Sequence, residues 1–150
     1  MHFIGIDIGT SSICGVVYHP STQSVISVTK ENCANISSPD NWEKKQDADI
    51  IINIVWDIVR EFQTRYKDIG GIGITGQMHG IVYTDVQGNA VSPLYTWQDG
   101  RGNLRYKDNL NYATHLKNIT GYPAASGYGL VTHYYNIQNG LVPADAFKLC

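Results

Sequence analysis

The sequence predicts an α/β fold with a mixed sheet and flanking helices. Three β-rich segments open the chain, at residues 3–7, 13–19 and 24–34, and turn residues separate them. Strands joined by tight turns form an antiparallel meander. A helix pattern follows, and further short strands come after it. The order of a meander, a helix and more strands indicates the α/β class.

The helix is expected to begin where Asp47 or Asp49 can cap it, since a short carboxylate accepts hydrogen bonds from unpaired N–H groups. We expect Gly70 and Gly71 to end it. Residues 35–46, which are polar and contain a proline, are expected to form a loop. The apolar residues of the helix are spaced by three and four, which gives a wide buried face: Ile51, Val55, Ile58, Phe62 and Tyr66.

The second half alternates short strands with helices. The expected elements are, in order, a buried strand at 72–75, a turn at 76–80, strands at 81–85 and 93–97 around a hairpin turn at 86–89, a helix from after 102 to 118, a loop at 121–129, and helices starting near 130 and at 143.

Composition narrows the class of protein. The 150 residues suffice for one domain with a core, and 43% hydrophobic with 16% charged residues is typical of a globular chain. A net charge of −2 gives no positive field for nucleic acid or an anionic membrane. No segment has the form of a signal peptide or a membrane span. Three scattered cysteines argue against a disulfide framework or a zinc site and predict a cytoplasmic protein.

The first motif that indicates chemistry is the turn between the first two strands. Gly9 lets the backbone turn sharply, and the amides and hydroxyls of Thr10, Ser11 and Ser12 can then surround an anion. Asp7 cannot hold a phosphate itself, but it can hold Mg²⁺ through water. The alternative is an ordinary hairpin turn.

The second motif follows the strand at 72–75, where two glycines bracket Gln77, Met78 and His79. The amide and the imidazole can bond to hydroxyl groups, and the thioether can contact a carbon face. The alternative is a hairpin turn with a half-exposed histidine.

The third motif joins an aromatic platform to charged groups. Trp97 offers a flat surface to the C–H face of a sugar, and Asp99 and Arg101 offer acceptors and donors to its hydroxyls. The alternative is an Asp–Arg pair that fixes a loop, with Trp97 in the core. Tyr128 belongs to a tyrosine cluster that suits a sugar cleft or a packed helix equally well. No GxxxxGK[ST] sequence is present, which excludes a P-loop nucleotide site.

In this order the motifs resemble the FGGY family of carbohydrate kinases. "GIDIGTSS" is similar to the family's first phosphate motif, "GITGQMHGIVYTD" to its xylulokinase and sedoheptulokinase branches, and "WQDGR" to its WxDxR segment. "NWEKKQDAD" resembles the family's approach to the helix, and "TGYPAASGYGLVTHYYN" is most similar to sedoheptulokinase.

The resemblance implies an ATP-dependent phosphotransferase built from two ribonuclease-H-like lobes, with a ketose as the acceptor. Residues 1–150 would be part of the N-terminal sugar-binding lobe, without the C-terminal nucleotide-binding lobe and without the aspartate that acts as general base. The chain alone is therefore expected to be inactive. A homodimer is a further expectation, because related kinases are commonly dimers.

The site roles follow by position. Asp7, Gly9, Thr10, Ser11 and Ser12 would face the ATP phosphates and Mg²⁺. The residues that would contact the sugar are Gln77, Met78, His79, Trp97, Asp99, Arg101 and Tyr128. One departure is Cys14, where the family often has a basic residue that can touch phosphate.

Two other classes of protein stay open from the sequence. An actin-like ATPase shares the first motif but has no need for the second and third. A non-catalytic half-kinase would bind the sugar tightly without transferring phosphate.

Overall fold

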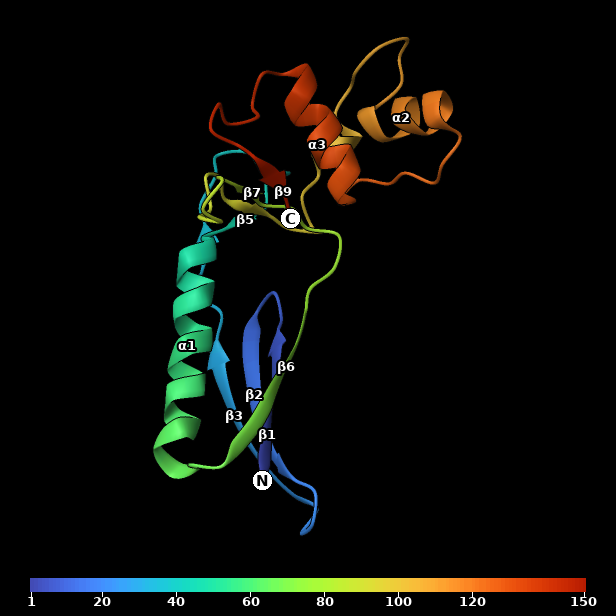
Figure 1. Ribbon diagram of the computed structural model, residues 1–150. Helices are drawn as coiled ribbons and strands as arrows, with labels where there is room; N and C mark the ends of the chain where they lie inside the picture. Colours follow the sequence, from blue (N-terminus) through green and yellow to red (C-terminus); the bar gives the residue numbers. More distant parts are fainter. The chain divides into compact units, whose positions relative to one another are not determined.

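The computed structural model describes residues 1–150. The chain forms two compact units (Figure 1). The first comprises residues 1–34 and 49–77, and the second comprises residues 35–48 and 78–150. Each unit is described by itself below.

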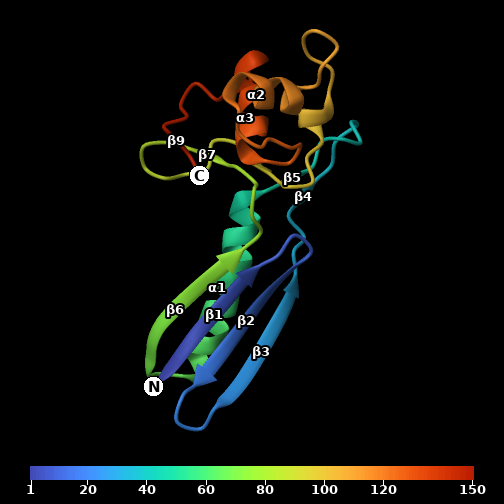
Figure 2. The same ribbon diagram turned by 90° about the vertical axis from the view of Figure 1, so that its right-hand side faces the viewer.

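The first unit is built on a four-stranded mixed sheet in the order β3-β2-β1-β6 (Figure 2). Antiparallel pairing joins β1 to β2 and β2 to β3, whereas β6 runs parallel to β1. The predicted meander and the mixed sheet are therefore confirmed. The strands are β1 (His2–Ile8), β2 (Ser12–His19), β3 (Ser24–Glu31) and β6 (Ile69–Gly76).

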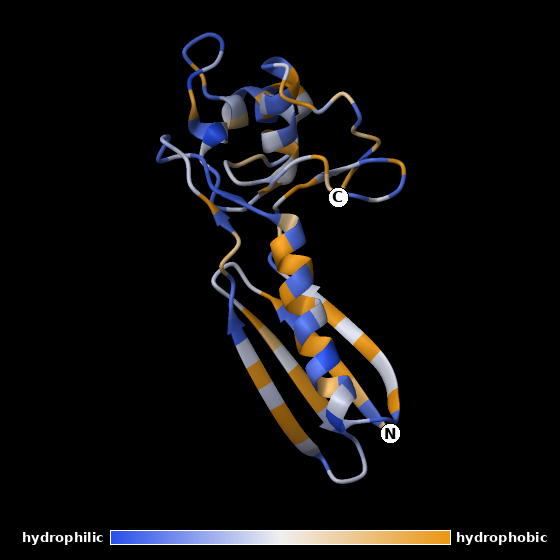
Figure 3. Ribbon diagram, turned by 90° about the vertical axis from the view of Figure 1, so that its left-hand side faces the viewer, coloured by the Kyte–Doolittle hydropathy of each residue, from blue (hydrophilic) through white to orange (hydrophobic).

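A single helix, α1 (Ala48–Arg65), packs on one face of this sheet. Apolar and polar residues alternate around it, as its mixed colouring in Figure 3 shows. Ile58 and Phe62 are fully buried, and they lie against β2 so closely that a side chain at Gly15 would collide with both. The predicted apolar face is thus the core of this unit. Asp47 directly precedes the helix, as expected of a capping position.

Two expectations for this unit were wrong. Gly70 and Gly71 do not end the helix, since it ends at Arg65 and both glycines lie inside β6. The strand predicted as buried is also well exposed, with Ile74 at 67%. The reason is that β6 pairs with β1 on one side only, while the buried side chains of α1 cover the middle strands.

The second unit contains two small sheets of two-residue strands. The predicted loop at 35–46 includes two of these strands. One sheet has the order β4-β5-β8 and the other pairs β7 with β9. Ile81, Tyr83 and Tyr95 form the buried cluster beside them. The strands are β4 (Asn35–Ile36), β5 (Lys45–Gln46), β7 (Tyr83–Thr84), β8 (Leu94–Tyr95) and β9 (Lys148–Leu149).

Three helical elements complete the second unit: the short 3₁₀ helix η1 (Arg101–Asn103), α2 (Tyr112–Thr120) and α3 (Gly129–Gln138). The helix predicted from residue 102 begins only at Tyr112. The Asn111 side chain caps it by accepting from the Thr114 amide at 2.7 Å, and a tight turn precedes it, with positive φ angles at Asp108 and Asn109.

The helix predicted at Pro143 is absent. The chain instead turns back as β9, where the Phe147 amide donates to the Thr84 carbonyl at 2.8 Å. Pairing with β7 therefore overrides the local helix signal of the proline. No helix in the structure is both long enough and apolar enough to cross a bilayer.

Candidate functional site

The turn between β1 and β2 is tightly fixed. The Gly9 amide donates to the Ser12 carbonyl at 2.9 Å, and a Cβ at Gly9 would lie only 2.7 Å from that oxygen. The buried Asn32 donates its Nδ2 to the Gly9 carbonyl at 2.9 Å from the end of β3. Asn32 supports the turn from 23 residues away, and no local sequence signal indicated it. The turn is thus a hairpin turn that hydrogen bonds hold both from within and from Asn32.

Gln77 is anchored to this same turn. Its Oε1 accepts from the Thr10 hydroxyl at 3.1 Å, and its amide donates to the Ile8 carbonyl at 2.9 Å. Gln77 was predicted as a sugar ligand, and the structure groups it with the phosphate motif. Ser11 and Ser12 are exposed beside it. The result is a turn rich in hydroxyl groups, which hydrogen bonds of Gln77 connect to the end of β6.

Asp7 and Cys14 are cross-strand partners at the same end of the sheet. Both line a hollow of about 370 Å³ on the face opposite α1, together with Thr75. The Asp7 side chain is exposed. One carboxylate with nearby hydroxyls fits Mg²⁺, which takes one or two carboxylates from a protein and completes its shell with water and phosphate. The departure at Cys14 therefore lies directly beside the predicted magnesium ligand.

In the second unit, His79 occupies a conformation that is uncommon outside glycine, with φ at 67°. Its ring is exposed and stacks on Tyr128, with the ring centroids 4.6 Å apart and the planes 4° from parallel. Met78 beside it is 72% exposed. A strained backbone that presents a stacked imidazole is a feature that binding sites often retain.

Trp97 lies next to the loop at 121–129. It is 49% exposed, so it is not the core residue that the alternative interpretation required. Gly127 of that loop has φ at 86°, and a Cβ there would overlap the Trp97 carbonyl oxygen. Tyr128, the next residue, is 40% exposed. Three of the predicted sugar ligands, His79, Trp97 and Tyr128, are therefore connected through one loop.

A cavity of about 490 Å³ opens beside the stacked pair. His79 and Tyr128 form part of its lining, and the rest is mainly apolar side chains of α2, α3 and the loop between them. It is partly open to solvent. Leu116, Leu130, Val131, His133, Tyr134 and Ile137 line it from the two helices.

Asp99 and Arg101 form a buried ion pair. Both are 1% exposed. The Arg101 Nε donates to Asp99 Oδ1 at 2.7 Å and its Nη2 donates to Oδ2 at 3.1 Å, while the Lys44 amide donates to Oδ2 at 3.0 Å. This is the bidentate pair that fixes a loop, as the alternative interpretation proposed. A direct contact of either residue with sugar stays a prediction.

Aromatic rings surround the Arg101 guanidinium. Its Cζ lies 4.2 Å from the Tyr95 ring centroid and 5.2 Å from that of Tyr135, which favours a desolvated cation. Burial raises the pKa of Tyr135 above its ordinary value. Tyr135 packs against the Tyr112 ring of α2, and the neighbouring Tyr134 packs against the His115 ring of the same helix. Both tyrosines therefore have the packing role expected for them. Three further residues are connected to Arg101 by hydrogen bonds, and the sequence did not indicate them: Asn136, Tyr83 and His133.

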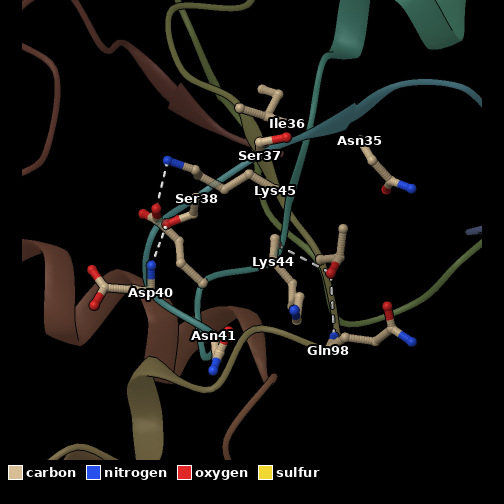
Figure 4. A pocket seen from close by; sticks show the side chains of 11 residues that line it. Asn35, Ile36, Ser37, Ser38, Asp40, Asn41, Lys44, Lys45 and Gln98 are labelled. Atoms are coloured by element: carbon tan, nitrogen blue, oxygen red, sulfur yellow. Dashed lines mark hydrogen bonds and ion pairs between the residues drawn. The ribbon is translucent and has the colours of Figure 1, made fainter.

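A second, polar pocket of about 430 Å³ lies around β4, β5 and the loop that joins them (Figure 4). Lys45 Nζ bonds to Glu43 at 2.8 Å there. Burial opposes ionisation of Glu43, but hydrogen bonds from Lys45 and Ser38 outweigh it and lower the pKa of that carboxyl. Because Glu43 also lies 3.5 Å from Arg101, its charge is already balanced within the protein.

The conformation of His79 leads to a prediction about stability. The free energy of unfolding should be about 1 kcal/mol higher for His79→Gly than for His79→Ala. Both variants lack the ring, but only glycine adopts positive φ without cost. Urea unfolding of the two variants measures the difference. Equal stabilities would show that the backbone at His79 is unstrained.

The comparisons with known proteins identify the family and the fold. The model of the FGGY family of carbohydrate kinases, N-terminal domain, matches residues 2–133. The mixed α/β fold is that of sugar kinases: a xylulose kinase structure from Brucella ovis superposes on the whole chain with a TM-score of 0.80 at 22% identity, covering 32% of that structure. One from Rhodospirillum rubrum gives 0.79 at 20% identity, with the same coverage. The chain belongs to the FGGY family of carbohydrate kinases.

Curated relatives come from two branches of this family. The xylulose kinase of Staphylococcus xylosus is 31% identical over 109 residues, which is 71% of this chain and 22% of that protein. The sedoheptulokinase of Mus musculus is 29% identical over 162 aligned positions, covering 91% of this chain and 33% of that protein. The chain thus spans between a fifth and a third of the length of the relatives it matches.

Proposed function

We propose that the protein containing this chain transfers the γ-phosphate of ATP to a primary hydroxyl of a ketose, with xylulose or sedoheptulose as the preferred acceptor. The observation that carries this proposal is the group formed by His79, Trp97 and Tyr128. Aromatic and imidazole rings that are exposed yet held by a tight loop suit the C–H face and hydroxyls of a sugar. Relatives named for both ketoses support the acceptor class.

The turn after β1 would serve the phosphate groups. The exposed hydroxyls of Ser11 and Ser12 and the fixed backbone at Gly9 would bind phosphate oxygens, and Asp7 would hold Mg²⁺ through water. Magnesium would neutralise the charge that develops on the transferred group. Gln77 would keep Thr10 in place beneath this turn.

Asp99 and Arg101 have a positioning role in this proposal. Arg101 donates from all three of its guanidinium nitrogens to protein oxygens, and Asp99 accepts on both of its oxygens. Both side chains are buried, and their hydrogen bonds are directed to protein atoms. The pair would instead hold the segment that carries Trp97.

Catalysis in such a site rests on positioning and charge neutralisation more than on covalent chemistry. The His79 ring and the Trp97 platform would orient the ketose, and exclusion of water would protect ATP from hydrolysis. The resemblance assigns no residue of 1–150 as the general base. We therefore expect this chain alone to bind ketose without transferring phosphate.

Asp7→Ala provides the test. In the protein of full natural length, the substitution should lower kcat by about 100-fold or more, because one charged group that acts at the transition state is lost. Ketose affinity should change less than threefold, since Asp7 does not belong to the sugar group. Turnover with a panel of sedoheptulose, xylulose, ribulose and fructose measures kcat, and calorimetry measures affinity.

Ser24→Ala, at the far end of the sheet, is the matched control and should leave both quantities unchanged. Unaltered phosphorylation by the Asp7 variant would refute its role. Sugar binding without any transfer by the full-length wild type would favour a non-catalytic half-kinase.

A further inference from the structure

A chain of hydrogen bonds runs from the buried ion pair toward the cavity, and its direction can be worked out. A guanidinium group only donates, so Arg101 Nη1 at 2.6 Å identifies the Asn136 atom facing it as the oxygen. The Asn136 amide nitrogen must then face the other way. It donates to the Tyr83 hydroxyl at 3.2 Å.

The next step fixes the imidazole of His133. The Tyr83 hydroxyl accepts from Asn136, and the only other hydrogen-bond partner of this hydroxyl is the His133 Nδ1 at 2.9 Å, which is therefore the acceptor for its proton. Tyr83 stays protonated because burial raises the pKa of its hydroxyl. A nitrogen that accepts a hydrogen bond carries no proton, so the neutral ring of His133 holds its proton on Nε2.

The Nε2 side of this ring is open. His133 lines the cavity beside His79 and Tyr128, and its Nε2 has no hydrogen-bond partner in the protein. No buried side-chain nitrogen or oxygen in the structure lacks a partner, so this atom is accessible to solvent. His133 therefore adds a hydrogen-bond donor to the lining of a mainly apolar cavity.

We infer that His133 is a further ketose-contacting residue, which donates Nε2–H to one oxygen of the sugar while the C–H face lies against the apolar wall. The inference rests on the proposed function and extends its sugar group by one residue. Because the cavity is partly open to solvent, the other hydroxyls of the ketose keep their water. Only one oxygen of the sugar loses its water, and the His133 donor replaces that water. No polar group of the sugar is then buried without a partner, which would cost free energy.

Three variants of this chain test the inference. His133→Phe keeps a ring but loses the donor, and His133→Gln keeps an N–H at a similar reach. Tyr83→Phe keeps its ring and removes the hydroxyl that orients the histidine. The matched control is His115→Phe, because the His115 imidazole also bonds to a tyrosine hydroxyl, at 3.0 Å from Tyr134, but lies outside the cavity lining.

Two measurements keep the inference separate from the proposed function. Nitrogen-15 spectra of the imidazoles should show a bare Nδ1 on His133 in the wild type and a mixture of tautomers in Tyr83→Phe. Titration with xylulose and sedoheptulose should show about tenfold weaker binding by His133→Phe, a loss below threefold by His133→Gln, and no change by His115→Phe.

The possible results distinguish a failure of the His133 inference from a failure of the proposed function. A protonated Nδ1 in the wild type, or unchanged ketose binding by His133→Phe, would overturn the inference. If the spectra are as expected but the wild-type chain binds neither ketose, then the proposed function fails, and the sugar contact of His133 fails with it.

Discussion

Replacing Arg101 by methionine should lower the free energy of unfolding by about 3–5 kcal/mol, because the variant leaves the Asp99 carboxylate buried without its partner. This is a large part of the stability of a typical domain. The Asn136 amide also loses its guanidinium donor. Urea unfolding followed by circular dichroism measures the loss.

Arg105→Met is the matched control. Arg105 is exposed, and it bonds to Asn109 in the surface turn before α2, so its loss should cost no more than about 0.5 kcal/mol. A double variant, Asp99→Leu with Arg101→Met, should recover part of the stability, since removal of both charges removes the unpaired one. A loss of less than 1 kcal/mol in Arg101→Met would contradict the structural role given to the pair.

The buried pair also shows where sequence reasoning reaches its limit. "WQDGR" indicated polar recognition because aromatic and charged residues adjoin, and the pattern alone could not tell a surface cluster from an enclosed one. What encloses Asp99 and Arg101 comes from distant segments: Lys44, Tyr95 and Asn136. Burial that depends on long-range packing leaves no local trace at the residues it covers.

The fold of the first unit could be predicted because its signals are local. Tight turns determine the meander, and the spacing of Ile51, Ile58 and Phe62 determines the face of α1. The predictions for the second unit were less accurate. Two-residue strands carry too little pattern to recognise, and β9 exists only because residues 82–84 offer it a partner.

The same contrast applies to the site. Gly9 and the hydroxyls after it were recognisable because the turn chemistry lies within six residues. Asn32, Tyr83 and His133 act on groups up to 50 residues away, and each looks like an ordinary strand or helix residue in the sequence. A polar residue on the inward side of a predicted helix, such as Asn136, was the one signal that could have pointed to the buried network.

Gly127→Ala should cost about 3 kcal/mol of stability and weaken ketose binding as well. One part, about 1 kcal/mol, comes from the positive φ of 86°, and the remainder comes from the overlap of the new methyl group with the Trp97 carbonyl, which forces the loop or the tryptophan to move. Gly88→Ala separates the two terms, because Gly88 has a similar φ of 90° but open space around its Cβ position, so it should cost only about 1 kcal/mol and leave binding intact. Urea unfolding and ketose titration of both variants measure the effects. If the two variants lose equal stability, the contact of Gly127 with Trp97 is not what holds the sugar platform in place.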